Sequence, residues 1–194
     1  LFMGPRFNAM FLKMSKFHWI GVGLGILAIA ILFYRYLVHD GDFDVYWAAT
    51  FRYVHGLKIH IYEQNVFTYP TFASFMLLPV YPLGYTGGKI LFFAVNVIFL
   101  VGAVYVCQRE VLYGSAVRAA TLVIALLFSF RSILAVFNNQ QTDILIFGLI
   151  IFGLAAFARM PVLASTLMAI AAGLKANPLF MVLLPIYKKL WAAA

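Results

Sequence analysis

Long apolar stretches separated by short polar breaks run along most of the chain. Such stretches occupy residues 19–38, 90–107, 119–137 and 144–158, and very few charged residues interrupt them. Since an α-helix rises about 1.5 Å per residue, a stretch of about 20 apolar residues can cross the hydrocarbon core of a bilayer. The pattern therefore predicts four membrane spans, and the fold class that we expect is an all-α polytopic membrane protein.

Residues 161–187 form a further apolar stretch that is interrupted near its centre by Lys175-Ala176-Asn177-Pro178. A charge and a proline both disfavour the middle of a membrane helix, so we expect a hairpin of two short segments with Lys175 near the turn. Broken helices of this kind occur where protein or a water-filled cavity covers the loose backbone.

Residues 39–68 are the most polar part of the chain, and the longer segment 39–89 contains two helices that are too short to cross a bilayer. Asp42 or Asp44 can cap an aromatic-rich helix that ends near Gly56. Residues 70–83 are apolar but short and contain three prolines, and residues 84–88 read as a loop. Because Trp and Tyr favour the membrane interface, we predict two interfacial helices within this loop.

The composition excludes several other classes of protein. Of the 194 residues, 65% are hydrophobic and only 10% are charged, and the mean hydropathy is +0.98. A soluble domain is about 45–50% apolar and about 25% charged, so a soluble enzyme and a disordered chain are both excluded. With Cys107 as the one cysteine, an intrachain disulfide scaffold is excluded as well.

The distribution of basic residues predicts the orientation in the membrane. The chain has 14 Lys and Arg against 6 Asp and Glu, and the basic residues stand in small groups between the apolar stretches. If residues 70–83 do not cross, then the N-terminus, Arg109, Arg118 and Arg159 all fall on one side, which the positive-inside rule identifies as cytoplasmic. We predict a multi-pass protein of the cell inner (cytoplasmic) membrane, with residues 39–89 outside. The partner is a lipid bilayer, and no basic patch suggests a nucleic acid.

This topology brings three polar features to the outer face, namely the acidic start of the loop, the polar break at residues 138–143 and Lys175. Ionisable residues in apolar segments are candidates for function. Asp42 and its neighbours have two readings, either a helix cap with solvated acids or a functional site that provides a general base or metal ligands. The further ligands of a metal site would have to be His55, His60 or Glu63. Because these residues lack a diagnostic spacing, no metal site is predicted. Lys175 either reaches the interface or binds a phosphate, and Gln140 and Gln141 read most simply as a polar turn.

Several short motifs resemble the polyprenol-phosphate-mannose-dependent mannosyltransferases of glycosyltransferase family 87, which are GT-C membrane glycosyltransferases. The resemblance lies in Asp42-Phe43-Asp44-Val45-Tyr46-Trp47-Ala48-Ala49, Phe67-Thr68-Tyr69-Pro70-Thr71-Phe72, Gln141-Thr142-Asp143 and Gly173-Leu174-Lys175-Ala176-Asn177-Pro178. This chain departs from the family pattern at Ile61, Thr71, Gln140 and Asp143, where Pro, Pro, Gly and Asn are usual. Since the chains of this family are longer, the resemblance implies that residues 1–194 are the N-terminal half of a protein with a single transmembrane domain.

The resemblance also implies a reaction and the residues that carry it. A sugar passes with inversion from a polyprenyl-phosphate carrier to an acceptor hydroxyl, Asp42 is the general base, and Asp44 is the second choice for that role. Lys175, Gln141 and Asp143 are candidates for substrate binding, as are Tyr46, Arg52 and Tyr69 of the outer loop. The lipid-linked sugar is a substrate, so no cofactor is predicted.

Two other functions remain open from the sequence. The chain is alternatively a non-catalytic membrane subunit derived from the same GT-C fold and packed against protein partners in a larger complex. A small transporter with a broken helix at Lys175 is a third hypothesis, although the sequence contains no inverted repeat to support it.

Overall fold

The computed structural model of the protein describes residues 16–59, 70–111 and 116–175. Their secondary structure is helical, with no strand in these ranges, in agreement with the predicted all-α class. In chain order the elements are α2 (Lys16–Val38), α3 (Asp42–Val54), α4 (Thr71–Phe75), the 3₁₀ helix η1 (Leu78–Leu83), α5 (Gly84–Val106), the π turn η2 (Cys107–Val111), α6 (Ala116–Asn138), α7 (Asp143–Ala156) and α8 (Pro161–Leu174).

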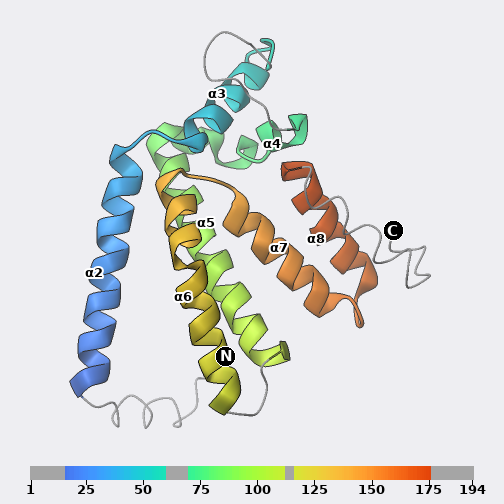
Figure 1. The fold of residues 1–194 in the computed structure, drawn as a ribbon. Helices are drawn as coiled ribbons and strands as arrows, with labels where there is room; N and C mark the ends of the chain where they lie inside the picture. Colours follow the sequence, from blue (N-terminus) through green and yellow to red (C-terminus); the bar gives the residue numbers. More distant parts are fainter. Residues whose placement is uncertain (1–15, 60–69, 112–115, 176–194) are drawn as a thin grey trace, which may run out of the picture.

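The helices form a bundle with a cap of short helices at one end, as Figure 1 shows. α2 runs toward the cap, α5 runs away from it, α6 returns, α7 leaves again, and α8 comes back. The cap consists of α3, α4 and η1, and we call this end of the bundle the α3 end. The turn between α6 and α7 and the end of α8 therefore both lie at the α3 end, as the sequence predicted for residues 138–143 and Lys175.

The membrane character of the fold rests on its apolar helices. Among the described residues, the stretch Phe72–Arg109 is long and apolar enough to cross a membrane, and it is 38 residues long. Gly23–Val38 and Asp42–Val54 pass the same test as a pair, bent by 48°. Val123–Asn138, Asp143–Ala156 and Pro161–Leu174 are apolar but shorter. The number of crossings and the orientation stay predictions.

One boundary differs clearly from the prediction, because residues 84–88 are the first turn of α5 and not a loop. Gly84 takes a φ of +71°, which ends η1 and lets a new helix start. Tertiary packing then stabilises this glycine-containing turn: a Cβ on Gly88 would lie 2.7 Å from the Trp47 ring of α3. The span expected from residue 90 thus begins at Gly84, while α2, α6 and α7 lie close to their predicted positions. α8 corresponds to the first segment of the hairpin expected at residues 161–187, and the second segment lies outside the described residues.

The cap is fastened to the bundle by side chains of α3 and α4. α3 buries Phe43, Tyr46 and Ala49, which stand three residues apart on one face of the helix. The buried hydroxyl of Thr50 donates to the Ser74 carbonyl oxygen at 2.7 Å, which links α3 to α4. The aromatic-rich helix ends at Val54, and Gly56 follows with a φ of +67°, so its predicted end near Gly56 is confirmed.

Candidate active site

The start of α3 lies directly against the turn between α6 and α7. The backbone N–H of Asp42 donates to the carbonyl oxygen of Asn139 at 2.9 Å. A Cβ on Gly41 would lie 2.8 Å from that same oxygen. Since the φ of Gly41, −167°, is open to any residue, glycine is required here by the close approach of two backbones and not by its dihedral freedom.

Gln140 connects this turn to the end of α2. Its side chain is 1% exposed, and Nε2 donates to the carbonyl oxygens of Tyr36 at 2.9 Å and His39 at 2.6 Å. Gln140 has a φ of +56°, in the left-handed region that glycine adopts most easily. The reading of Gln140 as a polar turn is therefore confirmed, and its side chain also joins this turn to the end of α2.

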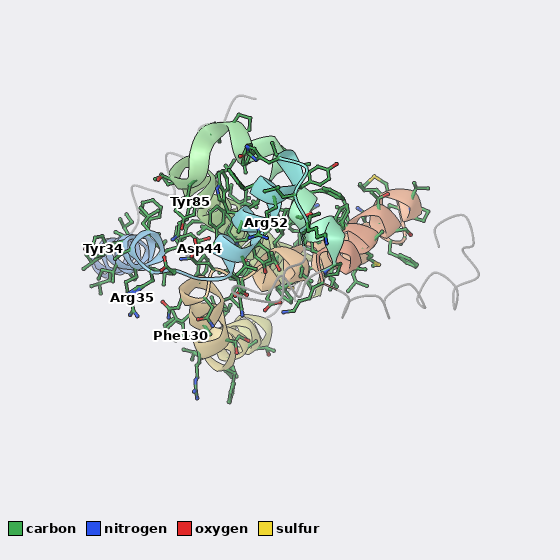
Figure 2. The ribbon with its side chains drawn as sticks, turned by 90° about the horizontal axis from the view of Figure 1, so that it is seen from above. Tyr34, Arg35, Asp44, Arg52, Tyr85 and Phe130 are labelled. Carbon is green, nitrogen blue, oxygen red and sulfur yellow. The ribbon has the colours of Figure 1, made fainter. Side chains whose placement is uncertain are left out.

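The carboxylate of Asp44 has two hydrogen-bond donors. Oδ2 accepts the backbone N–H of Gly41 at 2.9 Å, which is the contact that an acid at the third helical position makes to the N-cap residue. Oδ1 accepts the hydroxyl of Tyr85. Figure 2 shows Asp44 and Tyr85 facing each other across the start of α3 and α5. The predicted helix cap is thus provided by Asp44, whose two oxygens both have structural partners.

A buried lysine that the sequence analysis did not single out completes this network. Lys89 is 2% exposed, and its ammonium donates to the His39 carbonyl oxygen at 2.8 Å and to the Tyr85 hydroxyl at 3.3 Å. It also lies 5.4 Å from the centroid of the Tyr85 ring. The available signal in the sequence was the spacing Tyr85…Lys89, since residues four apart share one face of a helix.

Asp143 and Lys175 form an ion pair that joins α7 to α8. The Lys175 Nζ lies 2.7 Å from the Asp143 Oδ1, and the two side chains are 32% and 38% exposed. Asp143 is the first residue of α7, and Lys175 directly follows the last residue of α8. Each charge therefore also complements the dipole of its own helix. The structure brings these two predicted site residues together, 32 positions apart in the chain.

The other predicted site residues are spread over the α3 end. Tyr46 is fully buried and packs on Phe92 at 6.2 Å between ring centroids. Arg52 lies in the last turn of α3, where its guanidinium donates to the Lys58 carbonyl oxygen at 3.5 Å. Gln141 is half-buried, with its backbone N–H on the Val136 carbonyl oxygen. Tyr69 lies outside the described residues.

An apolar groove leads to the ion pair from between α5, α6 and α7. Its volume is about 280 Å³, and the residues that line it include Leu100, Leu126, Ile133, Phe147 and, at one end, Asp143. Such an apolar groove can accommodate a hydrocarbon chain, and Asp143 is the charged residue that lines it. Within the described ranges, no three His, Cys, Asp or Glu residues lie together as a metal site would require.

Comparison with known proteins assigns the chain to one family model. The model of glycosyltransferase family 87 matches residues 67–194, which is more than half of the chain. No curated protein and no solved structure matches the chain. The matched region includes Gln141, Asp143 and Lys175, whereas Asp42 and Asp44 precede it.

Proposed function

Because this chain belongs to glycosyltransferase family 87, a family of membrane glycosyltransferases, we propose that it transfers mannose from a polyprenyl-phosphate carrier to an acceptor hydroxyl. The reaction takes place at the outer face of the inner membrane, at the α3 end of the bundle, and inverts the anomeric carbon. The observation that supports this proposal is the meeting of α3, the turn at residues 139–142 and the Asp143–Lys175 pair at one end of an apolar helix bundle.

Asp42 is the general base in this mechanism. Its carboxylate takes the proton of the acceptor hydroxyl while the hydroxyl oxygen bonds to the anomeric carbon and the bond from that carbon to the phosphate oxygen breaks. Asp44 is the second choice for the role, and its two oxygens accept hydrogen bonds from Gly41 and Tyr85 in the helix cap. The close packing of Gly41 and Asp42 on Asn139 holds the backbone of the base in one position.

Lys175 binds the phosphate that leaves. The phosphate departs with the electrons of the broken bond, so a cation beside it stabilises the transition state. An ammonium group has three N–H donors, and Lys175 is about a third exposed, which leaves donors for a phosphate oxygen while Asp143 orients the side chain. The groove between α5, α6 and α7 receives the first isoprene units of the carrier.

The test compares Asp42→Asn with Asp44→Asn in the full-length protein. Loss of a positioned general base lowers a rate by about 10²–10⁴-fold, so Asp42→Asn should nearly abolish mannose transfer and leave carrier binding intact. Asp44→Asn should lower stability by about 1 kcal/mol through the weakened cap, with a smaller effect on rate. Radiolabelled transfer in membranes and carrier binding in nanodiscs are the readouts. Wild-type rates for Asp42→Asn, with an inactive Asp44→Asn, would contradict the assignment.

A second candidate function is a non-catalytic GT-C-derived subunit of a membrane complex. The observation that favours it is the closed Asp143–Lys175 pair, because a pair that neutralises itself also serves as a plain contact between α7 and α8. Sugar transfer by the full-length protein distinguishes the two proposals. If the full-length protein transfers no sugar from any polyprenyl-phosphate donor and is isolated with partner subunits, the non-catalytic function holds.

A further inference from the structure

A second apolar groove lies between α2, α5 and α6. Its volume is about 480 Å³, and apart from Arg35 and Asn138 it is lined by apolar residues such as Ala28, Leu32 and Phe130. Leu100 and Ile133 line both this groove and the one that reaches Asp143. Leu100 of α5 and Ile133 of α6 therefore form a wall that the two grooves share.

Arg35 gives this groove a charged end. It lies in the last turn of α2 and is exposed, and its side chain makes no ion pair or hydrogen bond to any described residue. Asn138, the last residue of α6, lines the groove as well, so both polar residues lie at the α3 end. In Figure 2, which views that end, Arg35 and Phe130 mark the α2 side and the α6 side of the groove.

We propose that this groove binds one anionic phospholipid, with an acyl chain between α2 and α6 and the phosphate at Arg35. The guanidinium supplies several N–H donors in a planar arrangement that matches the oxygens of a phosphate. The side-chain amide of Asn138 offers a further donor to the head group. This lipid is not the sugar carrier, whose proposed phosphate site is at Lys175 and whose chain enters the other groove.

The lipid stabilises the position of α2 in the bundle. The described part of α2 packs against α5 through its second half. There the ring centroids of Phe33 and Tyr36 each lie 5.0 Å from the ring centroid of Phe93. Earlier in the helix, Leu24, Ile26 and Leu27 are all more than half exposed. An acyl chain in the groove fills the space between α2, α5 and α6 and attaches the part of α2 from Ala28 to Arg35 by dispersion contacts.

Native mass spectrometry of the delipidated full-length protein tests the proposal, with phosphatidylglycerol and phosphatidylcholine of identical acyl chains as probes. We expect one phosphatidylglycerol to bind, with clear preference over phosphatidylcholine. Arg35→Gln should weaken that binding by about tenfold or more, which corresponds to a loss of at least about 1.4 kcal/mol. Arg35→Lys keeps the charge and loses the planar donors, so it should weaken binding less than Arg35→Gln does. Arg159→Gln, at an exposed arginine in the turn between α7 and α8, is the matched control and should bind as the wild type does.

A second variant separates the groove from simple charge attraction. Ala28→Phe narrows the groove and leaves Arg35 in place, so it should lower phosphatidylglycerol binding while the charge is unchanged. Equal affinity of the wild type for the two lipids would overturn the proposal. So would wild-type binding by Arg35→Gln or by Ala28→Phe, the latter because it would mean that the lipid binds outside the groove.

Discussion

The Asp143–Lys175 pair permits the most direct test of the proposed site, because its structural and functional roles predict different magnitudes. The two side chains are 32% and 38% exposed and 2.7 Å apart. A partly exposed pair of this kind contributes about 0.2–1 kcal/mol to stability. Lys175→Met and Asp143→Asn should therefore each lower the unfolding free energy by no more than this amount, since either change breaks the same contact.

Carrier affinity should respond to the same two changes in opposite ways. If Lys175 donates to the carrier phosphate, Lys175→Met loses a hydrogen bond between charged groups, which amounts to about 1.5–3 kcal/mol or about 10–150-fold in Kd. Asp143→Asn removes a negative charge beside the phosphate. Two like charges about 5 Å apart repel by about 1–3 kcal/mol at the effective dielectric of a protein surface. Binding by Asp143→Asn should thus be as tight as that of the wild type, or tighter.

The assay is binding of a polyprenyl phosphate to full-length protein in nanodiscs, with thermal unfolding of each variant measured in parallel. Lys58→Met serves as the control, because Lys58 is an exposed lysine of the same outer loop and has no place in the proposed site. If Lys175→Met binds the carrier as tightly as the wild type and Lys58→Met do, then the pair only joins α7 to α8 and the phosphate site lies elsewhere.

Three further results are expected. Gly41→Ala places a Cβ 2.8 Å from the Asn139 carbonyl oxygen and should break at least one buried backbone hydrogen bond. The expected loss of stability, measured by thermal unfolding, is about 0.5–1.5 kcal/mol. Gly23→Ala is the control, because its Cβ would meet nothing within 4 Å, and it should be neutral or stabilising. Lys89→Met should destabilise the protein by about 0.5–1.5 kcal/mol, the net contribution of a hydrogen bond. The His39 carbonyl and the Tyr85 hydroxyl each lose the lysine and keep another partner, and an unchanged unfolding temperature would refute the buried network. In a Cys107→Ser background, an impermeant reagent should label intact cells at Lys58→Cys and not at Gly114→Cys, and the reverse pattern would invert the topology.

Local pattern in the sequence was enough to predict the helices and the gathering of polar segments at one end. The apolar stretches at residues 19–38, 119–137 and 144–158 correspond to α2, α6 and α7, because hydrophobicity and helix length are properties of neighbouring residues. The alternation of helix direction then places residues 138–143 and Lys175 with the outer loop, as expected. The helix cap was predictable as well, since Asp44 makes it to Gly41, three residues away.

Tertiary structure alone decided the partners of the polar side chains. Asp143 meets Lys175 over 32 positions, Lys89 meets His39 over 50, and Gln140 meets His39 over 101. No local periodicity encodes such pairs, because they depend on how whole helices pack against each other. The same reason explains why residues 84–88 were predicted as a loop: the glycines disfavour a helix locally, and only the Trp47 ring against Gly88 and the buried ammonium of Lys89 make a helical turn the stable form.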